Sequence, residues 1–321
     1  MTQNSPCMKR ILSCAIVYFT AVINQVSAQS LEGVNPDHLS VLSIRFSPPV
    51  IKKVELPGGI QLEYAEQGNT AGTPVIFLHG YTDSWHSFET VLSYLPDNIH
   101  AFVPSQRGHG NSSKLGISYH PKNFAADVAA FMKVKGLAKA IIVGHSMGGI
   151  IAQQFALDYP ELAKGIVLIG TDASFKDNPG LPEFTQEILK LSDPVPYEFA
   201  NEFQKGTCAK PIDAGYYKIL VNESLKVPAH IWKDVMNGIM DVDYRNQLYR
   251  ITQPALIVWG DKDGICSKND KDILIKGISN GRLLVYQETG HALHWEEPER
   301  FATDLVDFIV EISTQTNEEN K

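Results

Sequence analysis

Ser146 lies in the segment GHSMGG, directly after a run of apolar residues and between Gly144 and Gly148. We expect a strand to end at Gly144 and a helix to begin at about Met147, so that the serine occupies the turn between them. A side chain at position 144 or 148 would collide with neighbouring backbone in such a turn, whose strain lifts the serine hydroxyl clear of the chain. The segment therefore indicates a nucleophilic serine, although a glycine-rich corner without chemistry can carry the same letters.

A serine nucleophile needs a general base, and His291 is the best placed of the ten histidines. It lies in ETGHALHW, which we expect to be a loop between the last strand and the final helix. That position is at the same sheet edge as Ser146. His294 is a near rival, but we expect it to enter the helix and to serve packing.

The base in turn needs an acid to orient it, and three aspartates are candidates. WGDKD follows a predicted strand at 254–260 and offers Asp261 and Asp263. Asp172 follows another predicted strand, at 164–170. Serine, then acid, then histidine is the chain order of one known hydrolase arrangement. We favour Asp263 and keep Asp172 and Asp261 as alternatives.

Acyl transfer also needs donors for the developing oxyanion. The first would be the backbone N–H of Met147, the residue after the nucleophile. The second would be the N–H of Tyr81, in HGYTDSW after a predicted strand at 74–80, where Gly80 lets the backbone turn toward Ser146. We expect the side chains of Tyr81, Trp85 and Met147 to form an apolar wall of the substrate pocket.

The elements that would position these residues are short apolar runs separated by amphipathic helices. Pro57-Gly58-Gly59 predicts a hairpin over 54–68, after which the runs follow at 74–80, 99–105, 139–145, 164–170, 254–260 and 282–287. Strands of this kind are buried on both faces. The pattern predicts an α/β fold with a mostly parallel sheet covered by helices on both faces.

The strand rhythm is interrupted between about 175 and 250, where aromatic residues are scattered among helix formers. We expect a helical cap here, at the carboxyl edge of the sheet where such folds bind ligands. A cap rich in aromatics favours a narrow apolar pocket. The expected substrates are small to medium uncharged esters rather than triglycerides or polymers.

The first 28 residues differ from the rest. Lys9 and Arg10 precede an apolar run from Ile11 to Ile23, and VSA ends at Ala28. This is the pattern of a secretory signal peptide, and the run is too short to span a bilayer core of about 30 Å. We expect cleavage near Ala28, export to the periplasm or medium, and no stable membrane insertion afterwards. Residues 29–50 would be a lead-in and 51–321 the catalytic domain.

Composition excludes several other classes. The chain has 321 residues, 44% of them hydrophobic, and a formal charge of −8 with both signs mixed along its length. A buried core is expected, and the lack of a basic stripe argues against nucleic-acid binding. Cys7 and Cys14 would leave with the signal peptide, and the remaining pair, Cys208 and Cys266, is too few for a disulfide scaffold. Export permits a bridge between the two, although we favour free thiols. The oligomeric state is left open.

Five blocks, taken together, resemble the α/β-hydrolase-fold serine hydrolases: HGYTDSWHSF, QRGHGNS, GHSMGG, WGDKD and TGHALHWEEPERF. The resemblance runs from the hairpin to the helix after Pro298. It implies Ser146 as nucleophile, His291 as base and Asp263 as acid, with Tyr81 and Met147 at the oxyanion positions. Ser105 departs from the family, which usually has an aspartate there that supports the loop.

The resemblance also implies the reaction. Related dehalogenases and epoxide hydrolases have aspartate at the position of Ser146, so acyl transfer is favoured, with a carboxylic ester as the leading substrate and no cofactor or metal. Lactone, amide and carbon–carbon bond hydrolysis, and cofactor-free perhydrolysis, use a similar triad and remain alternatives. A ligand receptor with little turnover is a further, less favoured reading.

Overall fold

A computed structural model of the protein describes residues 47–115 and 118–319. The predicted signal peptide and most of the predicted lead-in lie outside these residues. Within them, no helix is both long enough and apolar enough to cross a membrane.

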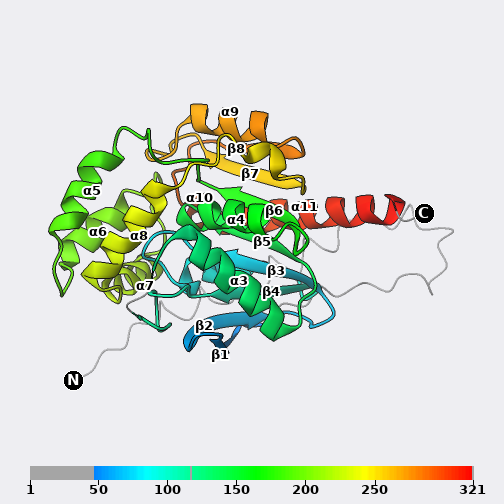
Figure 1. The fold of residues 1–321 in the computed structure, drawn as a ribbon, viewed down its shortest axis with the longest axis horizontal. Coiled ribbons are helices and arrows are strands. Elements are labelled where there is room, and N and C mark those ends of the chain that lie inside the picture. The colour runs from blue at the N-terminus through cyan, green and yellow to red at the C-terminus, as the bar shows by residue number, and fades with distance from the viewer. Residues whose placement is uncertain (1–46, 116–117, 320–321) are drawn as a thin grey trace, which may run out of the picture. The chain divides into compact units, whose positions relative to one another are not determined.

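Eight strands in the described part of the chain form one sheet, in the order β1-β2-β4-β3-β5-β6-β7-β8 (Figure 1). The strands from β3 onward pair in parallel, whereas β1 and β2 form a hairpin and β2 pairs antiparallel with β4. Each apolar run predicted as a strand coincides with one. The bounds are β1 (Val50–Leu56), β2 (Ile60–Gln67), β3 (Thr73–Leu78), β4 (Ile99–Pro104), β5 (Ala140–His145), β6 (Ala163–Ile169), β7 (Ala255–Gly260) and β8 (Gly281–Tyr286).

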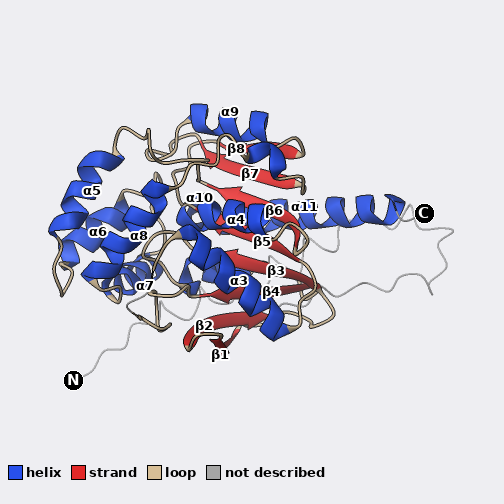
Figure 2. Ribbon diagram, in the orientation of Figure 1, coloured by secondary structure: helices blue, strands red, loops and turns tan. Residues whose placement is uncertain are grey.

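Helices cover both faces of this sheet, as Figure 2 shows, and the predicted fold class is confirmed. Alternate residues of β3 enter two different cores. Ile76 packs with the helices α3 (Pro121–Lys135), α4 (Met147–Asp158) and α9 (Lys268–Gly277). Phe77 points to the other face and packs with α2 (Glu89–Leu92), α10 (Leu293–Glu296) and α11 (Pro298–Glu319). Burial on both faces explains why the strands have no alternating polar pattern.

The segment between β6 and β7 forms four helices beside one end of the sheet (Figure 1): α5 (Leu181–Lys190), α6 (Tyr197–Lys205), α7 (Ala214–Leu225) and α8 (Ala229–Asp241). A short 3-10 helix, η5 (Leu248–Arg250), precedes β7. We call residues 175–250 the cap. Aromatic rings join the cap to the loop after β3: the Tyr81 ring centroid lies 5.3 Å from that of Trp232 and 5.7 Å from that of Phe203.

Candidate active site

Ser146 occupies the turn between β5 and α4. Its backbone has φ 53° and ψ −114°, a left-handed conformation that costs a non-glycine residue energy and is kept only where the surroundings enforce it. The surroundings do so here. A Cβ at Gly144 would lie 2.1 Å from the Gly148 carbonyl oxygen, and one at Gly148 would lie 2.0 Å from that of Leu78. The turn therefore closes tightly and leaves the Ser146 side chain at its outer surface.

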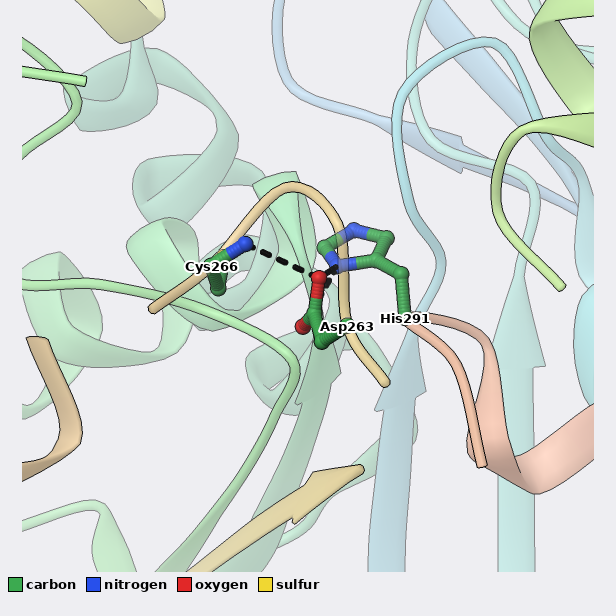
Figure 3. Close-up of side chains that lie close together, drawn as sticks. All are labelled: Asp263, Cys266 and His291. Carbon is green, nitrogen blue, oxygen red and sulfur yellow. Dashed lines mark hydrogen bonds and ion pairs between the residues drawn. The ribbon is translucent and has the colours of Figure 1, made fainter. Parts of the chain in front are cut away.

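His291 is buried in the loop after β8 and is hydrogen-bonded to Asp263, in the loop after β7 (Figure 3). His291 Nδ1 lies 3.0 Å from one Asp263 carboxylate oxygen and 3.1 Å from the other. The backbone N–H groups of Ile265 and Cys266 also donate to Asp263 Oδ1, at 2.8 Å each. Burial acts to raise the pKa of Asp263, but His291 and these donors outweigh it and hold that pKa below its ordinary value. The carboxylate is thus kept ionised against the imidazole.

The other two candidate acids are bonded elsewhere. Asp172 lies after β6 and forms an ion pair with Lys271 of α9, at 2.6 Å, and both side chains are buried. Asp261 accepts a hydrogen bond from the backbone N–H of Glu288 at 2.6 Å. Among the described residues, Asp263 is the one aspartate recorded in hydrogen-bond contact with His291.

The backbone N–H groups of Tyr81 and Met147 are placed at the same end of the sheet, one in the loop after β3 and the other at the first position of α4. Within the described chain, neither N–H is recorded with an acceptor. The Tyr81 side chain is fixed from the cap, because its hydroxyl donates to the backbone carbonyl of Trp232 at 2.5 Å. Both residues line a cavity between the sheet edge and the cap.

A cavity of about 770 Å³ lies between the sheet edge and the cap. Ser146 and His291 both line it. Within the described residues, the Ser146 hydroxyl and His291 are not hydrogen-bonded to each other. Such bonds are often long before a substrate binds. Much of the remaining wall is apolar, and it includes Tyr81, Met147, Phe175, Leu181, Phe184, Phe199, Phe203, Met236, Ile239 and Ile265.

Comparison with known proteins gives the family. The α/β-hydrolase fold family model matches residues 73–298, which include β3 to β8, the cap and the His291 loop. The chain belongs to the α/β-hydrolase fold family.

Individual relatives of this α/β-hydrolase are distant in sequence. The chain is 28% identical to Lipase 1 of Psychrobacter immobilis over 267 residues, which cover 75% of this chain and 78% of the relative. It is 25% identical to the bifunctional esterase/perhydrolase DCH of Acinetobacter calcoaceticus over 276 residues, covering 78% and 96%. A crystal structure of a putative aryl esterase from Burkholderia cenocepacia superposes with a TM-score of 0.76 at 24% identity, covering 83% and 100% of the two chains.

Trp85 does not lie where the sequence led us to expect it. It is absent from the lining of the cavity, and its ring stacks on His86 with centroids 3.8 Å apart. It starts the 3-10 helix η4 (Trp85–Phe88) and joins Phe77 and Phe88 in the core on the α11 face. The chain has already turned away from the site at this point, so Trp85 cannot form the pocket wall. Ser105 Oγ accepts a hydrogen bond from the Trp85 backbone N–H at 3.1 Å, which ties the two loops together without the family's usual aspartate.

Three residues at the cavity were not found from the sequence: Asp83, His145 and Gln204. His145 is buried, and burial holds its pKa well below the ordinary value. Asp83 and Gln204 are hydrogen-bonded to each other across 121 positions of the chain. HGYTDSW marks the loop that carries Asp83, but no local pattern indicates its partner in the cap.

Asp263, Cys266 and His291 are the residue types that bind metal ions, and their ligand atoms lie within 4.8 Å of one another. Hydrogen bonds within the protein explain why these three residues lie close together. Asp263 and His291 bind each other, and the Cys266 thiol donates to the Gly170 carbonyl oxygen at 3.4 Å (Figure 3 shows the three side chains). Burial raises the pKa of Cys266 well above its ordinary value, which keeps the thiol protonated and makes it a poor metal ligand. The two cysteines within the described residues, Cys208 and Cys266, are free thiols.

Proposed function

We propose that this ester hydrolase of the α/β-hydrolase fold cleaves carboxylic esters with Ser146 as nucleophile, His291 as general base and Asp263 as the acid that orients the base. One observation supports the proposal above the others. His291 lines the same cavity as Ser146 while its Nδ1 is bonded to a buried carboxylate. An imidazole held in this way keeps its proton on Nδ1 and leaves Nε2 free to accept one.

In the proposed reaction, Ser146 Oγ attacks the ester carbonyl as its proton passes to His291 Nε2. The carbonyl oxygen becomes an oxyanion, which accepts hydrogen bonds from the backbone N–H groups of Tyr81 and Met147; each such donor contributes about 3–4 kcal/mol in the transition state. Nε2 then returns the proton to the leaving alkoxide, and the alcohol departs from the acyl-enzyme. Water attacks the acyl group by the same route in reverse, releasing the acid and restoring Ser146.

The cavity supports small to medium uncharged substrates. Apolar side chains from the cap form much of its wall, and a volume of about 770 Å³ is within the usual range for sites that bury a small molecule. The ionisable residues at its cap side are acidic, namely Glu187, Glu198 and Glu202, and neither lysine nor arginine is among its described lining residues. These carboxylates would repel a negatively charged substrate, and no lysine or arginine among the described lining residues would offset the repulsion. Anionic esters should therefore be poor substrates.

Hydrolysis of 4-nitrophenyl esters by the purified protein tests the proposal. We expect turnover of the acetate, its loss in Ser146→Ala, and a kcat/KM that peaks at short chains in a series from acetate to palmitate. A hemisuccinate ester should react more slowly than the butyrate ester of the same alcohol. A peak at ten carbons or more, especially on emulsions, would identify a lipase and overturn the substrate proposal. Full activity in Ser146→Ala would overturn the mechanism.

Perhydrolysis is the second candidate, favoured by the similarity to a bifunctional esterase/perhydrolase. The acyl-enzyme on Ser146 would be the same, and hydrogen peroxide would replace water as the second nucleophile, giving a peracid. Adding acetate ester and peroxide together, and measuring peracid by halide oxidation, distinguishes the two. Peracid formation that is lost with Ser146→Ala would support this activity.

A further inference from the structure

Asp83 is a buried carboxyl group in the loop that carries Tyr81. It is 2% exposed and lines the cavity. Its Oδ1 accepts a hydrogen bond from Gln204 Nε2 at 2.8 Å, and its Oδ2 accepts one from the Ser87 hydroxyl at 3.3 Å. In the described part of the chain, Asp83 has no recorded ion pair with lysine or arginine. A carboxyl group buried without a cation is costly and calls for a specific role.

The bonds of Asp83 connect the Tyr81 loop to the cap. Gln204 lies at the end of α6, and its amide nitrogen also donates to the Ser224 hydroxyl of α7, at 2.8 Å. Ser224 Oγ lies 3.1 Å from Thr82 Oγ1, so the cap contacts this loop at two successive residues. Thr82 has φ 63°, a conformation that these contacts help to hold.

The same carboxyl group is connected to the segment that carries the general base. Ser87 Oγ lies 3.3 Å from His294 Nε2, and the Trp295 indole N–H donates to the Ser87 carbonyl at 2.9 Å. Both residues follow His291 in α10. Asp83 therefore lies where three parts of the site meet: the Tyr81 loop, the cap helix α6 and the His291 segment.

Asp83 can change charge near neutral pH. Burial raises its pKa to about 7, against the lowering effect of Gln204, Ser87, His291 and the Gly80 backbone. The titratable groups that face it are His291 in the loop after β8, His294 of α10 beyond Ser87, His145 at the end of β5, Cys208 after α6 and Tyr216 of α7. Burial lowers the pKa values of His145 and His294 and raises those of Cys208 and Tyr216, so these four stay neutral around pH 7. His291 is the facing group that gains and loses a proton in the proposed reaction.

We propose that Asp83 is a positioning residue that fixes the Tyr81 N–H toward the oxyanion by bonding its loop to Gln204 of the cap. The inference rests on the proposed function. An ionised carboxylate accepts a stronger hydrogen bond than a neutral acid does, so the Asp83–Gln204 bond is strongest above pH 7 and weakens as the pH falls. The Asp83–Gln204 bond thereby couples the position of the cap to oxyanion stabilisation, beside the contacts that Tyr81 and Thr82 make with the cap.

The test follows the rate at which a fluorophosphonate labels Ser146, measured by mass spectrometry of the intact protein. Phosphonylation forms the Ser146 Oγ–P bond, releases fluoride and needs the oxyanion donors, so it reports on them without an ester substrate. Asp83→Leu and Gln204→Leu should each slow labelling on the order of 10²-fold, as expected when a reacting group is misplaced by about 1 Å. The double variant should be no slower than either single variant, because both remove the same bond. Gln67→Leu is the matched control and should label at the wild-type rate. It removes the buried amide of Gln67 in β2, which donates to the Leu92 carbonyl of α2.

Asp83→Asn provides the second measurement. Asparagine can accept from Gln204 and donate to Ser87, but only as a neutral group, so labelling should be clearly faster than in Asp83→Leu and should stay below the wild-type rate above pH 7. The pH profile of labelling should lose the ionisation near pH 7 that belongs to Asp83. Multiplicative losses in the double variant, or an Asp83→Asn protein as slow as Asp83→Leu, would overturn the proposal. A wild-type protein that is not labelled at Ser146 would instead overturn the proposed function.

Discussion

The Lys271 ammonium group lies 2.6 Å from an Asp172 carboxylate oxygen, and both side chains are buried at the edge of the sheet beside Asp263. The Lys271 ammonium also donates to the Thr171 carbonyl oxygen. The aspartate after β6 is thus neutralised by its own cation, while the aspartate after β7 faces the histidine. The two carboxylates have different partners, and their replacement should have different consequences.

Asp263→Asn should lower kcat on the order of 10⁴-fold, because an amide at this position favours the wrong tautomer of His291. The measurement is hydrolysis of 4-nitrophenyl acetate at pH 8. Asp261→Asn is the matched control, and we expect it to stay near the wild-type rate because Asp261 contacts the Glu288 backbone instead. Equal losses in the two variants would contradict the assignment.

Lys271→Met should destabilise the fold by about 3–5 kcal/mol, the usual cost of leaving one member of a buried ion pair without its partner. Urea unfolding followed by circular dichroism measures this free energy. Lys190→Met, which removes an exposed ion pair with Glu187, should change the free energy of unfolding by no more than about 0.5 kcal/mol. A Lys271→Met protein as stable as Lys190→Met would mean that Asp172 is satisfied in another way.

Glu66 should contribute to stability at neutral pH and lose that contribution in acid. Burial acts to raise its pKa, but bonds to His100, Lys52 and Lys135 outweigh this and lower the pKa from 4.5 to about 2. A carboxylate with a lowered pKa stabilises the folded state above its unfolded-state value, and the contribution disappears as the pH falls from about 4.5 to 2. The difference in free energy of unfolding between wild type and Glu66→Gln should therefore shrink over that range. A constant difference would contradict the prediction.

The mature protein should begin near Gln29 and be found outside the cytoplasm. The basic residues, apolar run and Val-Ser-Ala sequence of the first 28 positions together form the expected export signal. N-terminal sequencing of protein purified from the native host, after separation of cytoplasm from the exported fraction, checks this. An intact Met1 on cytoplasmic protein would refute it.

The sequence predicts the sheet well because buried parallel strands leave a direct trace. Each such strand is a short apolar run. The loops that follow them carry polar residues able to take part in acyl transfer, such as Ser146 after β5 and Asp263 after β7. The serine, acid and histidine could be chosen because the loops after parallel strands meet at one edge. These inferences need only local pattern and strand direction.

Contacts between distant segments leave no such trace. Trp85 lies four residues after Tyr81, and nothing local indicates that η4 carries it into the core on the opposite face. The bonds of Asp83 to Gln204, and of Asp172 to Lys271, join positions 121 and 99 apart. Buried polar pairs of this kind depend on how the cap and α9 pack against the sheet. That packing produces no periodic pattern in a single sequence.

The chain leaves the sheet after Ile169, forms the cap and returns to the sheet at Ala255. The strands on either side, β6 and β7, nevertheless pair directly with each other in parallel. No residue of the cap takes part in the pairing of these two strands. An insertion at such a point can lengthen, shorten or be exchanged while Ser146, Asp263 and His291 keep their supports, since these residues lie on the loops after β5, β7 and β8. Substrate range can thus diverge through one contiguous stretch of chain, provided that a new cap keeps the bonds that Gln204 and Trp232 make to the Tyr81 loop.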